Sequence, residues 1–378
     1  MKVCHMTSTH RPKDQRIFYK ECISLAKTGY DVFLVEQGPS EKIDGVTIVG
    51  TGEINNSRYY RLLVRPKKIY ELALKVNADI YHFHDMELIP YGLKLKKKGK
   101  KVIFDYHEDY AMRFSESDAL VGPNFLKKIL GKLYIQYEKD SIKRFDAMIS
   151  VTPHICDRLR KINYNTVMIT NYPLLQKNSK WGQETVYEKS SNYIAFAGQI
   201  SDTYRLSFIV ECIQNIPNVF LKLCGPERKK GDLEKLRAVD HNNKMEYKGI
   251  LDYNQIPDFI SNSRCAVVLS TYGSNTGGHI GTLGNNKLFE AMLCGVPVIC
   301  TDYDLWKAIV KQYDCGICVN SYSEKEIIDA VNQIFSHPDM AEKMGKNGRK
   351  AVLEEFNWNT QENELLRLYK TVSDSVNK

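Results

Sequence analysis

Residues 284–300, GNNKLFEAMLCGVPVIC, combine amide, cationic and acidic side chains at a spacing that could bind a nucleotide. The run is typical of a short helix followed by a turn and a buried strand. Free backbone N–H groups near Asn285 and Asn286 could bind a phosphate, and Lys287 adds a full positive charge there. Glu290 lies about one turn further on the same face, where its carboxylate could accept hydrogen bonds from ribose hydroxyls. The simpler alternative is a capped helix with a solvated lysine–glutamate pair.

A polar loop near the N-terminus is a second candidate for chemistry. The loop THRPKDQR, residues 9–16, follows an expected strand and would overhang a ligand site. His10, Asp14 and Arg16 are therefore candidate contacts for an acceptor. An ordinary surface loop is the alternative for these three residues.

Two histidines in YHFHD, residues 81–85, fall within another expected strand. We expect His82 and His84 to point to opposite faces of this strand, so that at most one reaches a ligand. His84 is the better candidate because it is next to Asp85.

Two short motifs have metal-ligand spacing, but their contexts favour other roles. CGIC, residues 315–318, has no second cysteine pair and falls in a strand-like run, which indicates small buried thiols. DYD, residues 302–304, matches a short acidic motif that binds metal in some enzymes, but it directly follows an expected strand, where a turn is the simpler interpretation. We therefore expect no metal site.

The elements that must position these residues alternate between strands and helices in both halves of the chain. Expected strands fall at 2–7, 31–37, 78–85, 101–109, 145–153 and 165–173, and again at 193–198, 219–225, 245–250, 265–271, 296–302 and 315–319. A polar stretch without periodicity separates the two series. This pattern predicts an α/β protein of two doubly wound, Rossmann-like parallel-sheet domains facing one another across a cleft. The expected domains are 1–176 and 192–355, joined by a linker at 177–191.

Several motifs together resemble glycosyltransferase family 4 (group 1), whose members have the two-domain GT-B fold. NNKLFEAMLCGVPVICTD (285–302) resembles the family signature, and the segment 79–110, with HDMEL and DYHEDY, is similar to bacterial polysaccharide, O-antigen and capsule members. VMITNYP (167–173), AFAGQI (195–200) and FNWNTQENELLRLY (356–369) extend the resemblance over nearly the whole chain. It implies that a C-terminal helix within 356–378 returns to the N-terminal domain.

The resemblance implies a donor site in the C-terminal half. Glu290 matches the glutamate that holds the nucleotide ribose, while Lys287 and the amides near Asn285 and Asn286 would lie by the diphosphate. In the implied reaction, a sugar is transferred from a nucleoside diphosphate sugar to an acceptor, and the configuration at the anomeric carbon is retained. The donor would be a UDP-sugar or a GDP-sugar. The acceptor would be a glycan or a lipid-pyrophosphate-linked sugar of cell-surface polysaccharide synthesis.

Three further residues take roles from the resemblance. His107 matches a histidine beside the donor sugar, Gly198 opens the loop under the phosphates, and Arg205 would supply positive charge. His107, Arg205 and Lys287 are thus the expected catalytic residues. Because protein cations and amides would meet the phosphates, no cofactor or metal is expected for transfer.

One departure from the family pattern leaves alternatives open. Many members have a glutamate where this chain has Thr282, so the sugar-contacting group of that loop is unassigned; His279 is nearby. The rivals are a UDP-sugar 2-epimerase of the same fold and a catalytically silent nucleotide-sugar-binding protein.

Charge is divided unevenly along the chain. Residues 1–185 hold 31 Lys and Arg against 21 Asp and Glu, a net charge of +10, whereas residues 186–378 carry −2. The basic stretches 94–101 and 126–133 could hold the protein on an anionic membrane surface. No nucleic-acid-binding motif is recognisable. The start, MKVCHMTSTH, is too polar for a signal peptide, which favours a cytoplasmic protein that could lie peripherally on the inner membrane face.

Overall fold

The chain folds into two compact units in a computed structural model. The structure describes residues 1–52, 54, 55, 57, 59–107, 124–175, 180–182, 187–273 and 276–375, with the side chains of 124–128 excepted. The first unit comprises Met1–Asn171 and Thr360–Lys378, and the second comprises Tyr172–Asn359. Part of the predicted linker, residues 177–179 and 183–186, lies outside the described residues. Each unit is described by itself below.

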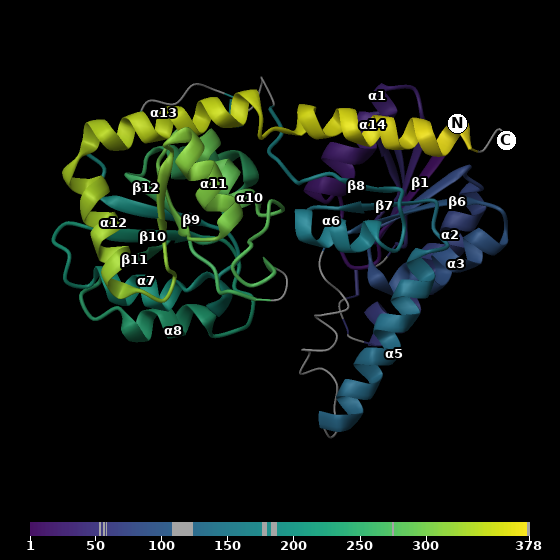
Figure 1. The fold of residues 1–378 in the computed structure, drawn as a ribbon, viewed down its shortest axis with the longest axis horizontal. Coiled ribbons are helices and arrows are strands. Elements are labelled where there is room, and N and C mark those ends of the chain that lie inside the picture. The colour runs from purple at the N-terminus through teal and green to yellow at the C-terminus, as the bar shows by residue number, and fades with distance from the viewer. Residues whose placement is uncertain are drawn as a thin grey trace. The chain divides into compact units, whose positions relative to one another are not determined.

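The first unit is built on a sheet of eight strands with the order β3-β4-β2-β1-β5-β6-β7-β8 (Figure 1). Its strands are β1 (Lys2–Met6), β2 (Asp31–Glu36), β3 (Glu41–Ile43), β4 (Val46–Gly50), β5 (Ile80–Phe83), β6 (Lys101–Tyr106), β7 (Ala147–Ser150) and β8 (Thr166–Met168). All neighbouring pairs are parallel except β3 with β4. The strand order reverses between β1 and β5, and in such sheets ligands bind beyond the carboxyl ends of the strands at that point.

Helices cover this sheet. They are the π-helix η1 (Gln15–Cys22), α1 (Ile23–Lys27), η2 (Tyr60–Val64), α2 (Arg65–Val76), η3 (Met86–Leu88), α3 (Ile89–Lys97), α5 (Asn124–Ile142), α6 (Pro153–Arg160) and α14 (Trp358–Asp374). Apolar residues of α2, α3, α5 and α6 form one core cluster with β1, β5, β6 and β7. The C-terminal helix contacts the same unit from the other end of the sequence, since the Tyr369 ring packs edge to face against Tyr30.

The hairpin of β3 and β4 was not predicted. Its two-residue turn is Asp44–Gly45, and both residues have positive φ angles of 51° and 82°. Such a turn matches the twist of the strands on either side, and Asp-Gly is a favoured sequence for it. The signal was present in the sequence, but β3 has only three residues and carries no apolar alternation.

The second unit is built on a parallel sheet of six strands with the order β11-β10-β9-β12-β13-β14. These strands are β9 (Tyr193–Ala197), β10 (Phe220–Cys224), β11 (Met245–Tyr247), β12 (Cys265–Val268), β13 (Val298–Thr301) and β14 (Gly316–Val319). This is the 3-2-1-4-5-6 order of dinucleotide-binding folds, with the reversal between β9 and β12. The prediction of an α/β protein with two doubly wound parallel sheets is confirmed.

Helices cover both faces of the second sheet, each over its own apolar cluster. They are η4 (Lys180–Gly182), η5 (Asp202–Tyr204), α7 (Leu206–Ile213), α8 (Asp232–Val239), η6 (Tyr253–Gln255), α9 (Ile256–Ser261), α10 (Asn286–Leu293), α11 (Asp304–Tyr313), α12 (Glu324–Ser336) and α13 (Pro338–Glu354). Residues of α7, α8 and α12 pack on one face, and residues of α9, α10, α11 and α13 on the other. In neither unit do the described residues form a helix long and apolar enough to cross a bilayer.

Candidate functional site

The second unit brings Lys287 and Gly198 together at the carboxyl end of β9. An added Cβ atom at Gly198 would lie 2.1 Å from the Lys287 Cε atom, so a side chain at this position would force the end of the lysine to move. The Lys287 amino group donates a hydrogen bond to the Tyr204 hydroxyl at 3.0 Å and lies 4.2 Å from the centre of the same ring. The cation is therefore held directly over the loop that the sequence assigned to the phosphates.

The start of α10 has the features of an anion site. Asn285 is the N-cap residue, and its side-chain oxygen accepts a hydrogen bond from the Lys287 backbone N–H at 3.1 Å. The Asn286 side-chain oxygen is buried without a hydrogen-bond partner among the described residues. Because the first N–H groups of a helix point outward and carry partial positive charge, an anion placed there is stabilised.

Glu290 lies one turn further along α10, as expected. It lines a small cavity with Lys287, between the ends of β9 and β12 and helices α9 and α10. The Tyr253 hydroxyl is hydrogen-bonded to the Glu290 carboxylate, and burial together with this carboxylate raises the pKa of Tyr253. The sequence analysis missed Tyr253 and Tyr204, because no motif marks an aromatic residue that orients a neighbour.

Arg205 follows Tyr204 in the sequence, and its side chain packs against Tyr322. It adopts a left-handed conformation with φ of 54°, and its Nε atom donates to the Ser321 carbonyl oxygen at 3.2 Å. Its guanidinium group stacks over the rings of Phe208 and Tyr322 at 4.7 and 4.2 Å. The structure thus supports the side chain on one side and leaves part of its charge exposed.

The glycine-containing loop before α10 is fixed by α11. The carbonyl oxygen of His279 accepts a hydrogen bond from the Asp304 N–H, and that of Thr282 accepts one from the Trp306 ring. Asp302 accepts from the Tyr272 hydroxyl at 2.5 Å and pairs with Lys307 at 3.2 Å. The DYD motif therefore lies at the turn from β13 into α11, with its first carboxylate already paired.

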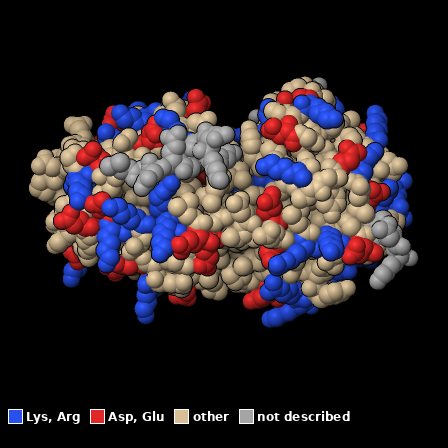
Figure 2. Space-filling view, turned by 90° about the horizontal axis from the view of Figure 1, so that it is seen from above, with Lys and Arg blue, Asp and Glu red and all other residues tan. Residues whose placement is uncertain are grey.

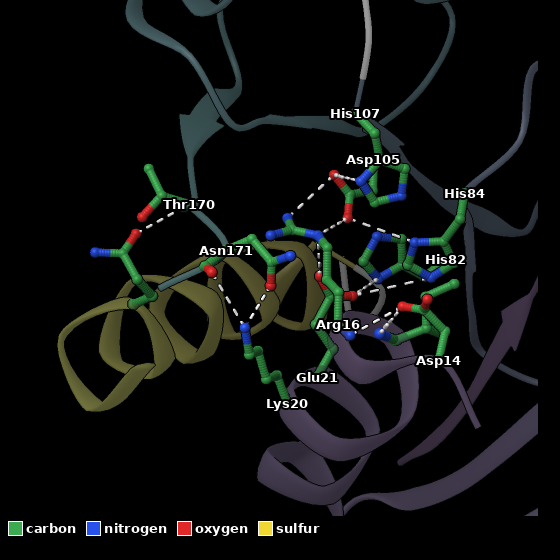
Figure 3. Close-up of polar contacts among 12 residues, drawn as sticks. Asp14, Arg16, Lys20, Glu21, His82, His84, Asp105, His107, Thr170 and Asn171 are labelled. Atoms are coloured by element: carbon green, nitrogen blue, oxygen red, sulfur yellow. Dashed lines mark hydrogen bonds and ion pairs between the residues drawn. The ribbon is translucent and has the colours of Figure 1, made fainter. Parts of the chain in front are cut away.

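In the first unit the central contact is a buried ion pair between Arg16 and Asp105 (Figure 3). The Arg16 Nε atom lies 2.8 Å from Asp105 Oδ2, and Nη2 lies 3.2 Å from Oδ1. Burial alone would raise the pKa of Asp105, but the Arg16 guanidinium holds it well below its usual range. Asp14 caps η1 by accepting hydrogen bonds from the Arg16 and Ile17 N–H groups. Arg16, with 4% of its surface exposed, is therefore placed to orient other groups rather than to face an acceptor directly.

The prediction that His82 and His84 point to opposite faces was wrong. Side chains two residues apart on a strand share a face. Their rings lie 4.5 Å apart, and both are fully buried against Glu21. His84 Nδ1 is 3.4 Å from Asp105 Oδ2, so this histidine supports the ion pair from the interior.

His107 and His10, assigned from separate segments, lie side by side. Their ring centres are 5.3 Å apart, and His84 stacks on His107 at 5.5 Å. Burial lowers the pKa of His107 to about 3, although Asp105, 3.7 Å away, acts in the opposite direction. His107 is therefore neutral, and its Nε2 atom has no hydrogen-bond partner within the described ranges.

His10 has the opposite electrostatic environment. Its Nδ1 atom lies 3.1 Å from Asp85 Oδ1, and Asp85 also accepts hydrogen bonds from Thr7 and from the backbone of Ser8. Burial alone would lower the pKa of His10, but the Asp85 carboxylate raises it to about 9. A protonated and a neutral histidine thus adjoin where the strand order of the first sheet reverses. The sequence analysis named Asp85 only as a neighbour and missed Asp105, whose role depends on contacts distant in sequence.

Two such sheets, with polar groups gathered at their carboxyl ends, define a protein of the GT-B class. The fold of sucrose-phosphate synthase from Thermosynechococcus elongatus is similar, with a TM-score of 0.75 at 17% identity over 99% of this chain and 100% of that chain. Anabaena Alr3699/HepE, solved in complex with UDP, gives a TM-score of 0.67 at 12% identity over 98% and 100%.

Family models match both units. The model described as Glycosyltransferase Family 4 matches residues 15–171, and the model described as Glycosyl transferases group 1 matches residues 178–351. The uncharacterised glycosyltransferase MJ1069 of Methanocaldococcus jannaschii is 20% identical over 84% of this chain and 79% of its own length. The chain belongs to the group 1 glycosyltransferases of family 4, which use nucleotide sugars and retain the anomeric configuration.

We predict that Gly198→Ala weakens binding of a nucleoside diphosphate about tenfold, roughly 1.4 kcal/mol. Because the backbone at Gly198 has a φ of 154°, the variant also loses stability through backbone strain. The new methyl group would displace the end of the Lys287 side chain, which is flexible enough to move. Calorimetric titration and a melting curve measure the two effects. Gly249→Ala is the matched control, since its backbone φ of 77° is also strained by a side chain but nothing lies within 4 Å of its added Cβ atom. Equal affinities in the two variants would show that Lys287 does not bind the nucleotide.

We predict that the free energy of unfolding falls between about pH 6.5 and pH 9 through His10. Its pKa is raised from 6.5 to about 9 in the folded state, so its contribution is complete below pH 6.5 and is lost as the pH rises through about 9. The contribution amounts to roughly 3 kcal/mol at most. Denaturant unfolding of wild type and His10→Gln across this range measures it. The difference between the two proteins should shrink as the pH rises, and a constant difference would contradict the prediction.

Proposed function

We propose that this protein transfers a sugar from a UDP-sugar to a glycan or lipid-pyrophosphate-linked acceptor in cell-surface polysaccharide synthesis. The observation that carries the proposal is the Lys287 amino group held over Gly198, with Glu290 one turn further along α10. Together they offer a cation for the diphosphate and a carboxylate for the ribose. The choice of UDP is supported by Anabaena Alr3699/HepE and Staphylococcus aureus TarM, both solved with UDP.

The main requirement of this reaction is to stabilise the negative charge that develops on the leaving group. As the glycosidic bond breaks, negative charge grows on the diphosphate, and preorganised donors stabilise it most. Lys287, the N–H groups that follow Asn285, and Arg205 are the donors of the second unit. We propose that they meet the diphosphate without a divalent metal.

The first unit would position the donor sugar and the acceptor. His107 is neutral and has a ring nitrogen free among the described residues, so it can hydrogen-bond a sugar hydroxyl. His10 keeps 27% of its side chain exposed and carries a charge, which suits a contact to an anionic acceptor. Arg16, Asp14 and His84 would act through these two histidines by fixing their surroundings.

A panel of nucleotide sugars, with product analysis, tests this function against its alternatives. Transfer or slow hydrolysis of a UDP-sugar is the expected outcome. Conversion to the 2-epimer would indicate an epimerase, and binding without turnover would indicate a silent binding protein. Adding EDTA to the assay should leave the rate unchanged. Loss of activity that Mg²⁺ or Mn²⁺ promptly restores would overturn the metal-independent mechanism.

We predict that Glu290→Gln lowers nucleotide affinity by roughly 1.5–3 kcal/mol, the value of a hydrogen bond to a charged group. Stability should change less, because Glu290 is only half-buried. Calorimetric titration with UDP and a melting curve separate the two effects. Glu211→Gln, on the exposed surface of α7, is the matched control. An unchanged affinity with a much lower melting temperature would make Glu290 a structural residue.

A membrane location for the acceptor is supported by α5. This helix extends well beyond the sheet of its own unit (Figure 1). Ile129, Leu133 and Tyr137 lie one turn apart and have 50%, 62% and 40% of their surfaces exposed, with Lys132 and Lys139 exposed beside them. An apolar stripe with flanking lysines is the pattern of a helix that lies in a bilayer interface. Lys127 and Lys128, which the sequence analysis included, have no described side chains.

The basic excess of the N-terminal half would add electrostatic attraction. On the face drawn in Figure 2, Lys and Arg side chains are interspersed with Asp and Glu, so the coloured residues form no single basic patch there. We therefore place the contact at α5, with the protein lying peripherally on the inner, cytoplasmic face of the membrane. Each lysine near an anionic surface contributes about 1 kcal/mol.

We predict that the protein sediments with anionic vesicles and not with neutral ones, and that salt weakens the binding. Leu133→Ser should reduce the bound fraction several-fold, because it places a hydroxyl in the apolar stripe. Leu353→Ser is the matched control, since Leu353 on α13 is also an exposed leucine. Binding that ignores lipid charge and salt, or equal binding of both variants, would leave α5 as an ordinary surface helix.

A further inference from the structure

Three histidines and one glutamate converge in the interior of the first unit. His5 lies on β1, His82 on β5, His84 directly after β5, and Glu21 in η1. All four are fully buried. One nitrogen or oxygen atom of each lies within 4.8 Å of the corresponding atoms of the others. Figure 3 shows the His82 and His84 rings directed toward Glu21.

The distances within this cluster suit an ion at its centre. Glu21 Oε2 lies 3.8 Å from His5 Nδ1, 3.8 Å from His82 Nδ1 and 3.9 Å from His84 Nε2. These separations are too long for hydrogen bonds. His5 Nδ1 and His84 Nε2 are 3.1 Å apart. A tetrahedral ion with bonds of about 2.0–2.1 Å places neighbouring ligand atoms roughly 3.3–3.4 Å apart, so small side-chain shifts would complete the coordination.

The groups around the cluster already orient each ligand. His5 Nε2 lies 3.1 Å from the Tyr369 hydroxyl, and His84 Nδ1 lies 3.4 Å from Asp105 Oδ2. Glu21 Oε1 lies 3.0 Å from Arg16 Nε. Metal-binding histidines usually engage a carboxylate or another polar group with the second nitrogen, and ligand carboxylates are held in a similar way. Three of the four ligands have such a partner.

Hydrogen bonds alone account for the cluster incompletely. A series of hydrogen bonds can run from His82 Nδ1 through the Tyr369 hydroxyl to His5. It can continue from His5 to His84 and Asp105. These hydrogen bonds leave the fully buried Glu21 Oε2 without a hydrogen-bond partner in the described part of the protein. They also leave this atom facing three ring nitrogens that it does not reach.

We propose that His5, Glu21, His82 and His84 bind one transition-metal ion, for which Zn²⁺ is the best match. Three imidazoles and one carboxylate are borderline nitrogen and oxygen ligands, and a closed set of four protein ligands is typical of structural zinc. A second possible group, His84, Asp105 and His107, fits less well because Arg16 already pairs with both Asp105 oxygens.

The ion would join segments that are far apart in the sequence. It would tie β1, η1 and β5 together, and through the contact of His5 Nε2 with the Tyr369 hydroxyl it would fix the C-terminal helix α14 against them. Its role would be structural, because it lies inside the first unit and no ligand belongs to the diphosphate site of the second. The absence of metal expected from the sequence would still hold for the transfer step.

Metal analysis of the full-length, untagged protein tests the proposal. Purified protein should contain about one zinc ion per chain. Protein refolded from denaturant in chelator should bind Co²⁺ at the same stoichiometry, with the intense visible absorption of tetrahedral cobalt, and Zn²⁺ should displace it. Stoichiometric Zn²⁺ should raise the melting temperature of the refolded protein. Less than stoichiometric metal in purified and reconstituted wild type, or cobalt spectra without tetrahedral bands, would overturn the proposal.

Variants locate the ion. His82→Gln and Glu21→Gln should bind Co²⁺ at least tenfold more weakly, as expected when one ligand is lost. His241→Gln, at an exposed histidine of the second unit, is the control for surface binding. His107→Gln should retain the metal; its loss there, with retention in His82→Gln, would assign the ion to the second group and reject this site. If the ligand variants fail to fold, the metal stoichiometry and the cobalt spectrum of the wild-type protein still test whether the ion is bound.

Discussion

The buried ion pair between Arg16 and Asp105 is the contact on which the first unit's site depends. It joins η1 to β6, and the same carboxylate contacts His84 and lies near His107. Removing one partner would leave an unpaired charge in the interior, at a cost of about 3–5 kcal/mol. Because Arg16 also contacts Glu21, its position links the outer histidines His10 and His107 to the buried cluster.

The π-helical form of η1 explains how these side chains meet. A π-helix has i→i+5 hydrogen bonds, so residues five apart lie over one another. Arg16 and Glu21 are five apart, and their side chains pair at 3.0 Å. In a regular α-helix the pair would diverge around the axis. This local distortion therefore serves both the ion pair with Asp105 and the orientation of the proposed metal ligand.

The two units solve the problem of placing charge in different ways. In the second unit Lys287 is half-buried and is held by one hydroxyl and one ring, both from Tyr204. The Lys287 side chain can move toward a ligand because its amino group is held only by these contacts with Tyr204 among the described residues. In the first unit the charges are buried and mutually paired, so His107 and His10 are fixed before any substrate binds. A movable cation in one unit and rigidly held polar groups in the other are both consistent with glycosyl transfer.

The sequence by itself determined the elements and the helix face that carries the second unit's candidate residues. Alternation of apolar strands and amphipathic helices is a local signal, and Lys287 and Glu290 are three residues apart in one helix, so their shared face follows from spacing. Only the tertiary structure decided the rest. His5, Glu21, His82 and Asp105 come from four separate segments, and their contacts depend on how β1, η1, β5 and β6 pack. Strand order and burial, which no local pattern specifies, turned Arg16 and His84 inward and brought His10 beside His107.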